Sequence, residues 1–259
     1  MNRFFSTPKW HTNYVKKINI KIDNFPLQNY KIVQLSDIHL GNRNISKMVL
    51  EDIIKKVINL NPDIVLITGD LIDARSKFNK EYLDPLKKLS QKIDCYFVFG
   101  NHEFGYFKNN ISKFKSYLKE LGIKILLNES TVINVKEKSY NLVGLSDYTG
   151  IFYDYPPNIK EAFRQVDNSL PTIVMVHRAG WIKNLKNQTF SLVLSGHNHG
   201  GQIAPFGIWV TKLRCKTNYI KGLYKLGKNK YAYISNGIGY SKLTFRFMAK
   251  SEIALIVLN

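Results

Sequence analysis

Residues 31–39 read Lys31-Ile32-Val33-Gln34-Leu35-Ser36-Asp37-Ile38-His39. The largely apolar first part of this stretch predicts a short buried β-strand over Lys31–Ser36. Residues 64–70 repeat the arrangement, because the apolar run Ile64–Ile67 is followed by Thr68-Gly69-Asp70. Each predicted strand therefore ends in side chains that can bind a cation.

A helix is predicted between these two strands. Ser46 can cap it, Asn61-Pro62 ends it, and its apolar side chains recur at helical spacing: Val49, Leu50, Ile53, Ile54, Val57 and Ile58. The alternation continues with a helix near Lys80–Gln91, a strand at Cys95–Phe99, a helix around Ile111–Leu121 and a short strand at Ile123–Leu126. Such βαβ alternation predicts parallel strands with helices on both faces.

The second half of the chain is richer in predicted strands. These are Thr131–Val135, Tyr140–Leu145, Thr172–Val176, Ser191–Leu194, Tyr231–Ser235 and Ile253–Leu258. We therefore expect an α/β fold, a two-layer mixed β sandwich flanked by helices, in which the second sheet is mixed. The chain has 259 residues and no internal repeat or low-complexity linker, which favours a single domain over residues 1–259.

Composition narrows the class of protein. Hydrophobic residues make up 44% of the chain, which is typical of globular proteins. Lys and Arg exceed Asp and Glu by 38 − 19 = 19, which fits either a solvated basic surface or attraction to nucleic acid, an anionic membrane or a phosphorylated substrate. Two distant cysteines, Cys95 and Cys215, exclude a disulfide framework and fit a reducing, cytoplasmic compartment. The longest apolar run near the C-terminus, Ile253–Leu258, is too short to span a membrane and the N-terminus lacks a signal peptide, so we expect a soluble chain.

Five predicted strands end in residues that can bind a metal. In chain order these are Asp37 and His39, Asp70, Asn101 with His102, His177, and His197 with His199. Five of the six histidines stand at these ends, and only His11 does not. Because ligands bind beyond the carboxyl ends of strands in open α/β sheets, we expect one shared site. Carboxylate, amide and imidazole ligands without a thiolate favour Mn, Zn or Fe.

The set and order of these motifs resemble the calcineurin-like metallophosphoesterase superfamily. Its motifs correspond to Asp37-x-His39, Gly69-Asp70, Gly100-Asn101-His102-Glu103, His177 and Gly196-His197-x-His199. The resemblance covers residues 31–258. Further segments, among them Asn236-Gly237-Ile238-Gly239 and Arg246-Phe247, are similar to a bacterial, often membrane-associated phosphodiesterase branch, whose relatives include lipid A pathway UDP-diacylglucosamine pyrophosphatases. The chain departs from many relatives at His177-Arg178-Ala179, where they have His-x-Pro.

The resemblance implies a centre of two divalent metal ions, with manganese expected first and zinc or iron as alternatives. It implies Asp37, His39, Asp70 and His199 around one ion, and Asp70, Asn101, His177 and His197 around the other. His102 is implied as the catalytic residue that orients the substrate or protonates the leaving group. Glu103 or a similar acid could fix the tautomer of that histidine.

We therefore expect hydrolysis of a phosphodiester or pyrophosphate by attack of a metal-bound hydroxide, on a lipid-linked or nucleotide substrate at the inner membrane face. Phe206, Ile208 and Trp209 could form an apolar lip on an anionic bilayer. The alternative is a nuclease or nucleotide phosphodiesterase whose basic surface binds nucleic acid. A scaffold protein with an inactive site is disfavoured by the complete motifs. Arg43 and Arg178 could contact phosphate or lie on the surface, and a cluster of aromatic residues from Tyr148 to Tyr155 could line a cleft.

Overall fold

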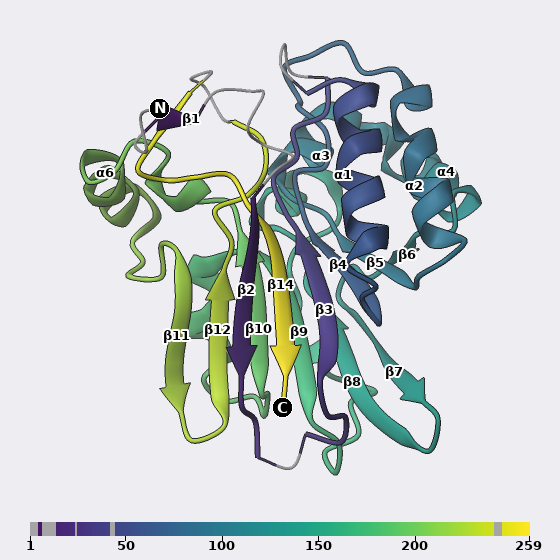
Figure 1. Cartoon of the computed structure of the whole chain (residues 1–259), viewed down its shortest axis with the longest axis vertical. Coiled ribbons are helices and arrows are strands. Elements are labelled where there is room, and N and C mark those ends of the chain that lie inside the picture. Colours follow the sequence, from purple (N-terminus) through teal and green to yellow (C-terminus); the bar gives the residue numbers. More distant parts are fainter. Residues whose placement is uncertain (1–4, 7–13, 24, 42–44, 241–244) are drawn as a thin grey trace.

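Strands from both ends of the chain build the first of two large sheets (Figure 1). The computed structural model describes residues 5–6, 14–23, 25–41, 45–240 and 245–259. The first sheet has the order β2 (Val15–Ile20), β14 (Ile253–Leu258), β3 (Tyr30–Leu35), β4 (Ile64–Thr68), β5 (Cys95–Val98) and β6 (Lys124–Ile125). Strands β3 to β6 are parallel, whereas β14 is antiparallel to β3. The first sheet is therefore mixed, like the second.

The second sheet carries five of the six strands predicted for the later part of the chain, and the sixth, Ile253–Leu258, is β14 of the first sheet. Its order is β11 (Gly222–Gly227), β12 (Lys230–Ile234), β10 (Leu192–Gly196), β9 (Thr172–Arg178), β8 (Lys138–Gly144) and β7 (Glu129–Val135). The four central strands are parallel, and the edge strands β11 and β7 pair with their neighbours antiparallel. A separate ribbon pairs β1 (Phe5–Ser6) with β13 (Arg246–Phe247). The expected mixed sandwich is confirmed.

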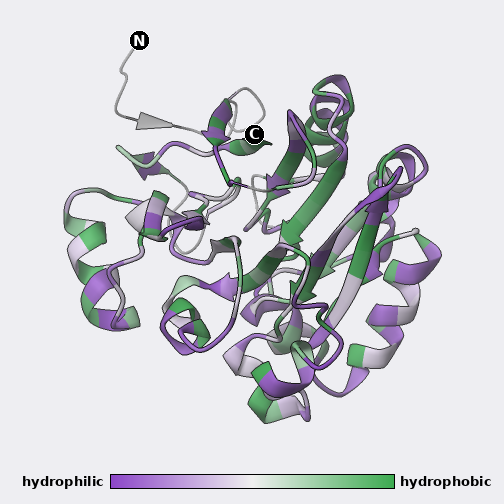
Figure 2. Cartoon of the chain, turned by 90° about the horizontal axis from the view of Figure 1, so that it is seen from below, coloured by the Kyte–Doolittle hydropathy of each residue, from purple (hydrophilic) through white to green (hydrophobic). Residues whose placement is uncertain are grey.

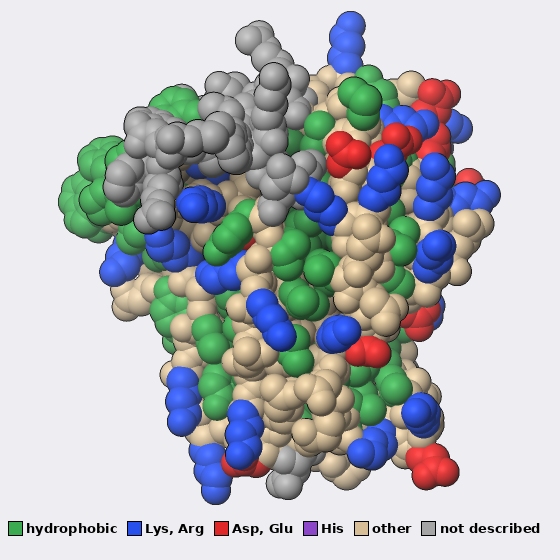
Figure 3. Space-filling view, viewed as in Figure 1, with side chains coloured by type: hydrophobic (Ala, Val, Ile, Leu, Met, Phe, Trp, Pro, Cys, Tyr) green, Lys and Arg blue, Asp and Glu red, His purple; other side chains and the backbone are tan. Residues whose placement is uncertain are grey.

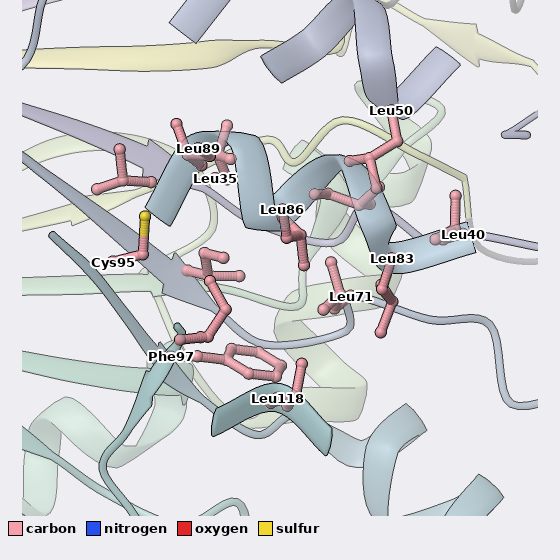
Figure 4. Packing of buried hydrophobic residues seen from close by; sticks show 14 of the residues in the cluster. Leu35, Leu40, Leu50, Leu71, Leu83, Leu86, Leu89, Cys95, Phe97 and Leu118 are labelled. Carbon is pink, nitrogen blue, oxygen red and sulfur yellow. The ribbon is translucent and has the colours of Figure 1, made fainter. Parts of the chain in front are cut away.

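Helices cover the outer face of the first sheet. They are α1 (Lys47–Asn59), α2 (Asp84–Ser90), which follows a short 3₁₀ turn η2 (Lys80–Leu83), and α4 (Ile111–Glu120). Ser46 caps α1 as predicted, since its hydroxyl accepts a hydrogen bond from the Val49 amide. Figure 4 shows Leu86 and Leu89 of α2 packed toward Cys95 and Phe97 of β5. Within the described ranges, no helix combines the length and apolar character needed to cross a bilayer.

The inner face of the first sheet does not carry helices, which corrects the prediction of helices on both faces. That face packs against the second sheet, with Ile32 and Leu66 on one side and Ile173 and Met175 on the other. Strands β3 to β5 are apolar at nearly every position because both of their faces are buried, and a helix or a sheet can supply the cover. Figure 2 shows the hydrophobic strands in the interior and hydrophilic residues on the outer sides of the helices.

The outer face of the second sheet is covered by shorter elements. Helix α5 (Ile159–Ala162) and the 3₁₀ segment η5 (Ala179–Leu185) bury Ala162, Ile182 and Leu185 against it. Two further elements lie near the strand ends, η4 (Tyr148–Tyr153) and α6 (Phe206–Cys215). The layers therefore follow the order helix, sheet, sheet, helix.

Candidate metal centre

The residues predicted at the strand ends meet at one edge of the sandwich. The first sheet contributes Asp37, His39, Asp70, Asn101 and His102, which follow β3, β4 and β5, and the second sheet contributes His177, His197 and His199 from β9 and β10. The two sheets approach so closely there that a Cβ on Gly69 would lie 2.3 Å from Nδ1 of His177. Only glycine therefore fits at that turn, where φ is also +93°.

One group of side chains contains Asp37, His39 and His199. Nε2 of His39 lies 3.1 Å from Nε2 of His199, and Oδ1 of Asp37 lies 3.5 Å from the same His199 nitrogen. All three residues are buried, with His199 the most accessible at 5%. Two ring nitrogens and one carboxylate oxygen thus face one another at distances that suit the ligands of a single cation.

A second group contains Asp70, His177 and His197, with Asn101 beside it. Nε2 of His177 lies 3.3 Å from Oδ2 of Asp70, 3.3 Å from Oδ1 of Asn101 and 3.2 Å from Nδ1 of His197. Nδ1 of His177 donates a hydrogen bond to the Thr68 carbonyl at 2.8 Å, so in the neutral ring that binds a cation the lone pair is on Nε2. That lone pair faces two oxygen acceptors, an arrangement that positive charge stabilises and that is typical of a metal-binding histidine.

The pKa values of His177 and Asp70 agree with a site built for positive charge, whereas burial lowers the pKa values of His39, His197 and His199. Burial opposes protonation of His177, but the Asp70 and Asp37 carboxylates raise its pKa to about 10. Asp70 itself is buried, and although burial opposes ionisation, the charge of His177 holds its pKa well below the usual value. Oδ2 of Asp70 also lies 3.8 Å from Nε2 of His39, so this carboxylate stands between the two groups.

Backbone conformation adds an independent sign of function. Among the seven predicted ligands, five have positive φ angles: Asp37 (51°), His39 (53°), Asp70 (52°), His197 (69°) and His199 (48°). Residues other than glycine rarely adopt this region, at a cost of about 1–3 kcal/mol each. Such strain persists where the surrounding structure holds it, and it concentrates at functional sites.

His102 lies beside the two groups with one ring nitrogen turned toward them. Its Nε2 is 3.9 Å from Oδ2 of Asp70, and its Nδ1 is 2.9 Å from the Ala74 amide and 3.3 Å from Oδ1 of Asp73. In the neutral ring Nδ1 accepts from Ala74, and in the charged ring it donates to Asp73, so Nε2 carries a proton in both forms. Burial opposes protonation, but the hydrogen bond with Asp73 and the charges of Asp70 and Glu103 raise the pKa of His102.

The suggested role beside the His102 ring therefore belongs to a similar acid, Asp73, and not to Glu103 itself. The Glu103 carboxylate instead accepts hydrogen bonds from the backbone amides of Asp70, Leu71, Ile72 and Gly100, at 2.8–3.2 Å. Glu103 is fully buried, and burial raises its pKa to about 7. This carboxylate ties the loop after β4 to the loop after β5. The sequence signal for Asp73 was its place three residues after Asp70 in a loop that already carries a predicted ligand.

A cavity of about 780 Å³ opens over these side chains. Among its lining residues are His39, Asp70, Asn101, His102, His197 and His199 from the centre, and Arg75, Tyr148, Arg178, Trp181, Lys183 and Arg214 from its walls. Arg178 was a candidate for phosphate contact, and its guanidinium lines the cavity while its Nε donates to Asp147 at 2.8 Å. Arg43 and His11 lie outside the described residues.

Two arginines contact the outer nitrogens of candidate ligands. Nη1 of Arg178 lies 3.1 Å from Nε2 of His197, and Nη2 of the fully buried Arg246 lies 2.9 Å from Nδ1 of His199. A guanidinium only donates, so each contact needs a lone pair on that nitrogen. A neutral histidine that binds a cation through its inner nitrogen carries a proton on the outer one. Cation binding at these two histidines therefore requires the two arginine contacts to open.

Comparison with known proteins finds similarity to metallophosphoesterases. A family model described as calcineurin-like phosphoesterase matches residues 30–201. A Helicobacter pylori protein called an uncharacterized metallophosphoesterase is 35% identical over 93% of this chain, which spans 63% of that protein's length. The Bacillus subtilis metallophosphoesterase YkoQ is 31% identical, and the match covers 86% of this chain and 81% of that protein. A Danio rerio transmembrane protein with a metallophosphoesterase domain is 30% identical, and the match covers 95% of this chain and 57% of that protein.

Solved structures support the fold at much lower sequence identity. The sulfate thiohydrolase SoxB of Thermus thermophilus matches with a TM-score of 0.53 and 12% identity, over 91% of this chain and 57% of that one. The NAD nucleotidase of Haemophilus influenzae matches with a TM-score of 0.50 and 15% identity, over 89% of this chain and 49% of that one. At these identities the likeness concerns the arrangement of sheets and helices alone.

Proposed function

This chain belongs to the calcineurin-like phosphoesterases, hydrolases of phosphoric esters, and we propose that it cleaves a phosphodiester or pyrophosphate with two divalent cations. The observation that carries the proposal is the meeting of two His/Asp groups, one on each side of Asp70, at the edge shared by the two sheets. Because the family and these groups agree, a dinuclear divalent metal site is the reading that best accounts for both.

We assign the ligands by position. One ion would be held by Asp37, His39, Asp70 and His199, and the other by Asp70, Asn101, His177 and His197. Nitrogen and oxygen donors without a thiolate suit manganese, with zinc or iron as alternatives. Two such ions supply an activated water at neutral pH and neutralise charge on the phosphate oxygens.

The protein's own residues complete the site. Nε2 of His102 carries its proton on the cavity side of Asp70, where it can donate to a leaving oxygen or orient the substrate. Asp73 positions the ring and stabilises its charged form through Nδ1. Arg178 offers guanidinium N–H groups on the cavity wall, beside His197, for a phosphate oxygen.

The rim of the cavity favours a lipid-linked substrate over nucleic acid. The wall carries Arg75, Arg178, Lys183 and Arg214, which suit any phosphorylated substrate. The apolar side chains of Tyr148 and Val210, next to the exposed Phe206 and Trp209, add contacts that suit a lipid tail. A location at the inner, cytoplasmic face of a membrane fits this rim and the two free cysteines.

A substrate panel tests the proposal. The chain would be stripped of metal, reconstituted separately with Mn, Zn or Fe, and assayed on a phosphomonoester, a diester, a pyrophosphate diester, a lipid-linked pyrophosphate and single-stranded DNA. We expect metal-dependent cleavage of diester or pyrophosphate, two ions per chain by elemental analysis, and no cleavage by a His177→Ala variant. Absence of metal-dependent cleavage across the panel, with two ions bound, would refute the proposal. Preference for DNA would favour the nuclease alternative.

A further inference from the structure

Helix α6 exposes a stripe of large apolar side chains to solvent. Phe206, Trp209, Val210 and Leu213 are exposed by 67%, 60%, 38% and 60%, at positions i, i+3, i+4 and i+7. This spacing places them on one face of the helix. Every side chain of α6 is at least partly exposed, so the helix does not owe its place to a buried face. Figure 3 shows hydrophobic side chains gathered at the upper left, where α6 lies in Figure 1.

The position of α6 connects this stripe to the metal centre. Val210, Thr211, Arg214 and Cys215 of the helix line the cavity. The first turn of α6 packs on the backbone that directly follows His199, since a Cβ on Gly207 would lie 1.8 Å from the Gly201 carbonyl oxygen. The helix is therefore fixed to the rim of the cavity. Whatever binds the stripe lies at the mouth of the site.

The charge around the stripe indicates what binds it. Lys212, Arg214 and Lys216 are exposed, and the segment from Phe206 to Lys216 contains no Asp or Glu. A second copy of this chain would bring two such basic helices together in a molecule of formal net charge +19. An anionic bilayer offers acyl chains for the aromatic and aliphatic side chains, and headgroup phosphates for the lysines.

We infer that α6 inserts the stripe Phe206–Trp209–Leu213 into the headgroup region of an anionic bilayer, which sets the cavity mouth at the level of lipid phosphates. The segment η4, whose Tyr148 also lines the cavity, exposes Tyr148, Ile151 and Phe152 by 45–73% and offers a second apolar contact. The membrane contact stands on the exposure and charge of α6. That the phosphate cleaved belongs to an amphiphile in that bilayer rests on the proposed function.

Vesicle binding by the metal-free full chain tests the inference without any need for activity. The triple variant Phe206→Ser, Trp209→Ser and Leu213→Ser would be compared with a control that removes exposed apolar side chains elsewhere, Met48→Ser with Val132→Ser. With vesicles of equimolar phosphatidylglycerol and phosphatidylcholine, we expect the triple variant to lose affinity by about tenfold or more. The control should bind like the unaltered chain. Acyl-chain bromination should quench fluorescence of the unaltered chain, and Trp209→Phe should remove most of that quenching while binding persists.

Several outcomes would overturn the inference. Equal binding by the triple variant and the unaltered chain would do so, as would absence of binding to anionic vesicles. A concentration-dependent dimer that the triple variant abolishes, without vesicle binding, would mean that the stripe is a contact between copies. The triple variant must also match the unaltered chain in its circular dichroism spectrum and melting temperature, which shows that it is folded. If the unaltered chain cleaves the soluble diester but does not bind anionic vesicles, the inference alone is overturned. If the unaltered chain binds vesicles but shows no metal-dependent cleavage, the proposed function alone is overturned.

Discussion

Replacing His102 with alanine separates catalysis from metal binding. Its Nε2 lies 3.9 Å from Oδ2 of Asp70, too far for a shared hydrogen bond, and the side chain is 14% exposed on the cavity. Loss of a general acid costs about 10²–10⁴ in rate, or roughly 3–5 kcal/mol in the barrier. The Ala74 amide loses its acceptor, which should cost about 1 kcal/mol of stability, or a fall in Tm of roughly 2–4 °C.

The assay compares two leaving groups in metal-loaded His102→Ala. An alkyl diester releases an alkoxide that needs a proton, so it should show the full loss in kcat. A nitrophenyl diester releases an acidic phenol, so its loss should be about tenfold or less. Elemental analysis should still find two ions per chain. Equal losses on both substrates together with missing metal would refute the reasoning, because His102 would then support the metal ligands and not the leaving group.

Three further variants address neighbouring carboxylates. Asp70→Ala should abolish metal-dependent hydrolysis more completely than His39→Ala, because Asp70 stands between both groups; higher residual activity in Asp70→Ala would count against a bridge. Asp73→Asn removes a charge that raises the pKa of His102. In the pH dependence of kcat on an alkyl diester, the basic limb should therefore move to lower pH, and an unmoved limb would contradict this role. Glu103→Ala leaves four backbone amides without an acceptor, so it should lower the free energy of unfolding of the metal-free protein by about 3–5 kcal/mol, measured by urea denaturation. The control Glu120→Ala, at an exposed residue, should change that free energy by less than about 0.5 kcal/mol.

The strands that position the site could be predicted from sequence because both of their faces are buried. Runs such as Ile64–Ile67 are apolar without interruption, and the polar residues that follow them, such as Thr68 and Asp70, are buried as well, at the edge of the sandwich where the site lies. Strands β2 and β11 were not predicted. In β11 exposed and partly buried residues alternate, so its sequence carries no apolar run. The apolar pattern identifies strands in the middle of a sandwich better than strands at its edges.

The site was predictable at its ligands but less so around them. Asp37 and His199 are brought together by a fold that the motif order indicates, although they lie far apart in the chain. Asp73 could not be ranked above Glu103, because both follow a predicted ligand closely and only the turn geometry decides which carboxylate faces His102. Helix α6 was not predicted as a helix, because its apolar stripe faces outward and local pattern analysis assumes that such a stripe faces the core.

Strand β14 has a consequence for how the chain is made. It lies between β2 and β3 in the first sheet, although it follows every other described strand in the chain. On the ribosome, β3 and β4 emerge early, while one edge of β3 has no partner and β2 has no neighbour at all until Ile253–Leu258 leaves the exit tunnel. An unpaired apolar edge is a template for association with other nascent chains. Among the described strands, the last in chain order is thus the one that closes the first sheet, so the apolar edge of β3 stays open until Ile253–Leu258 has been made.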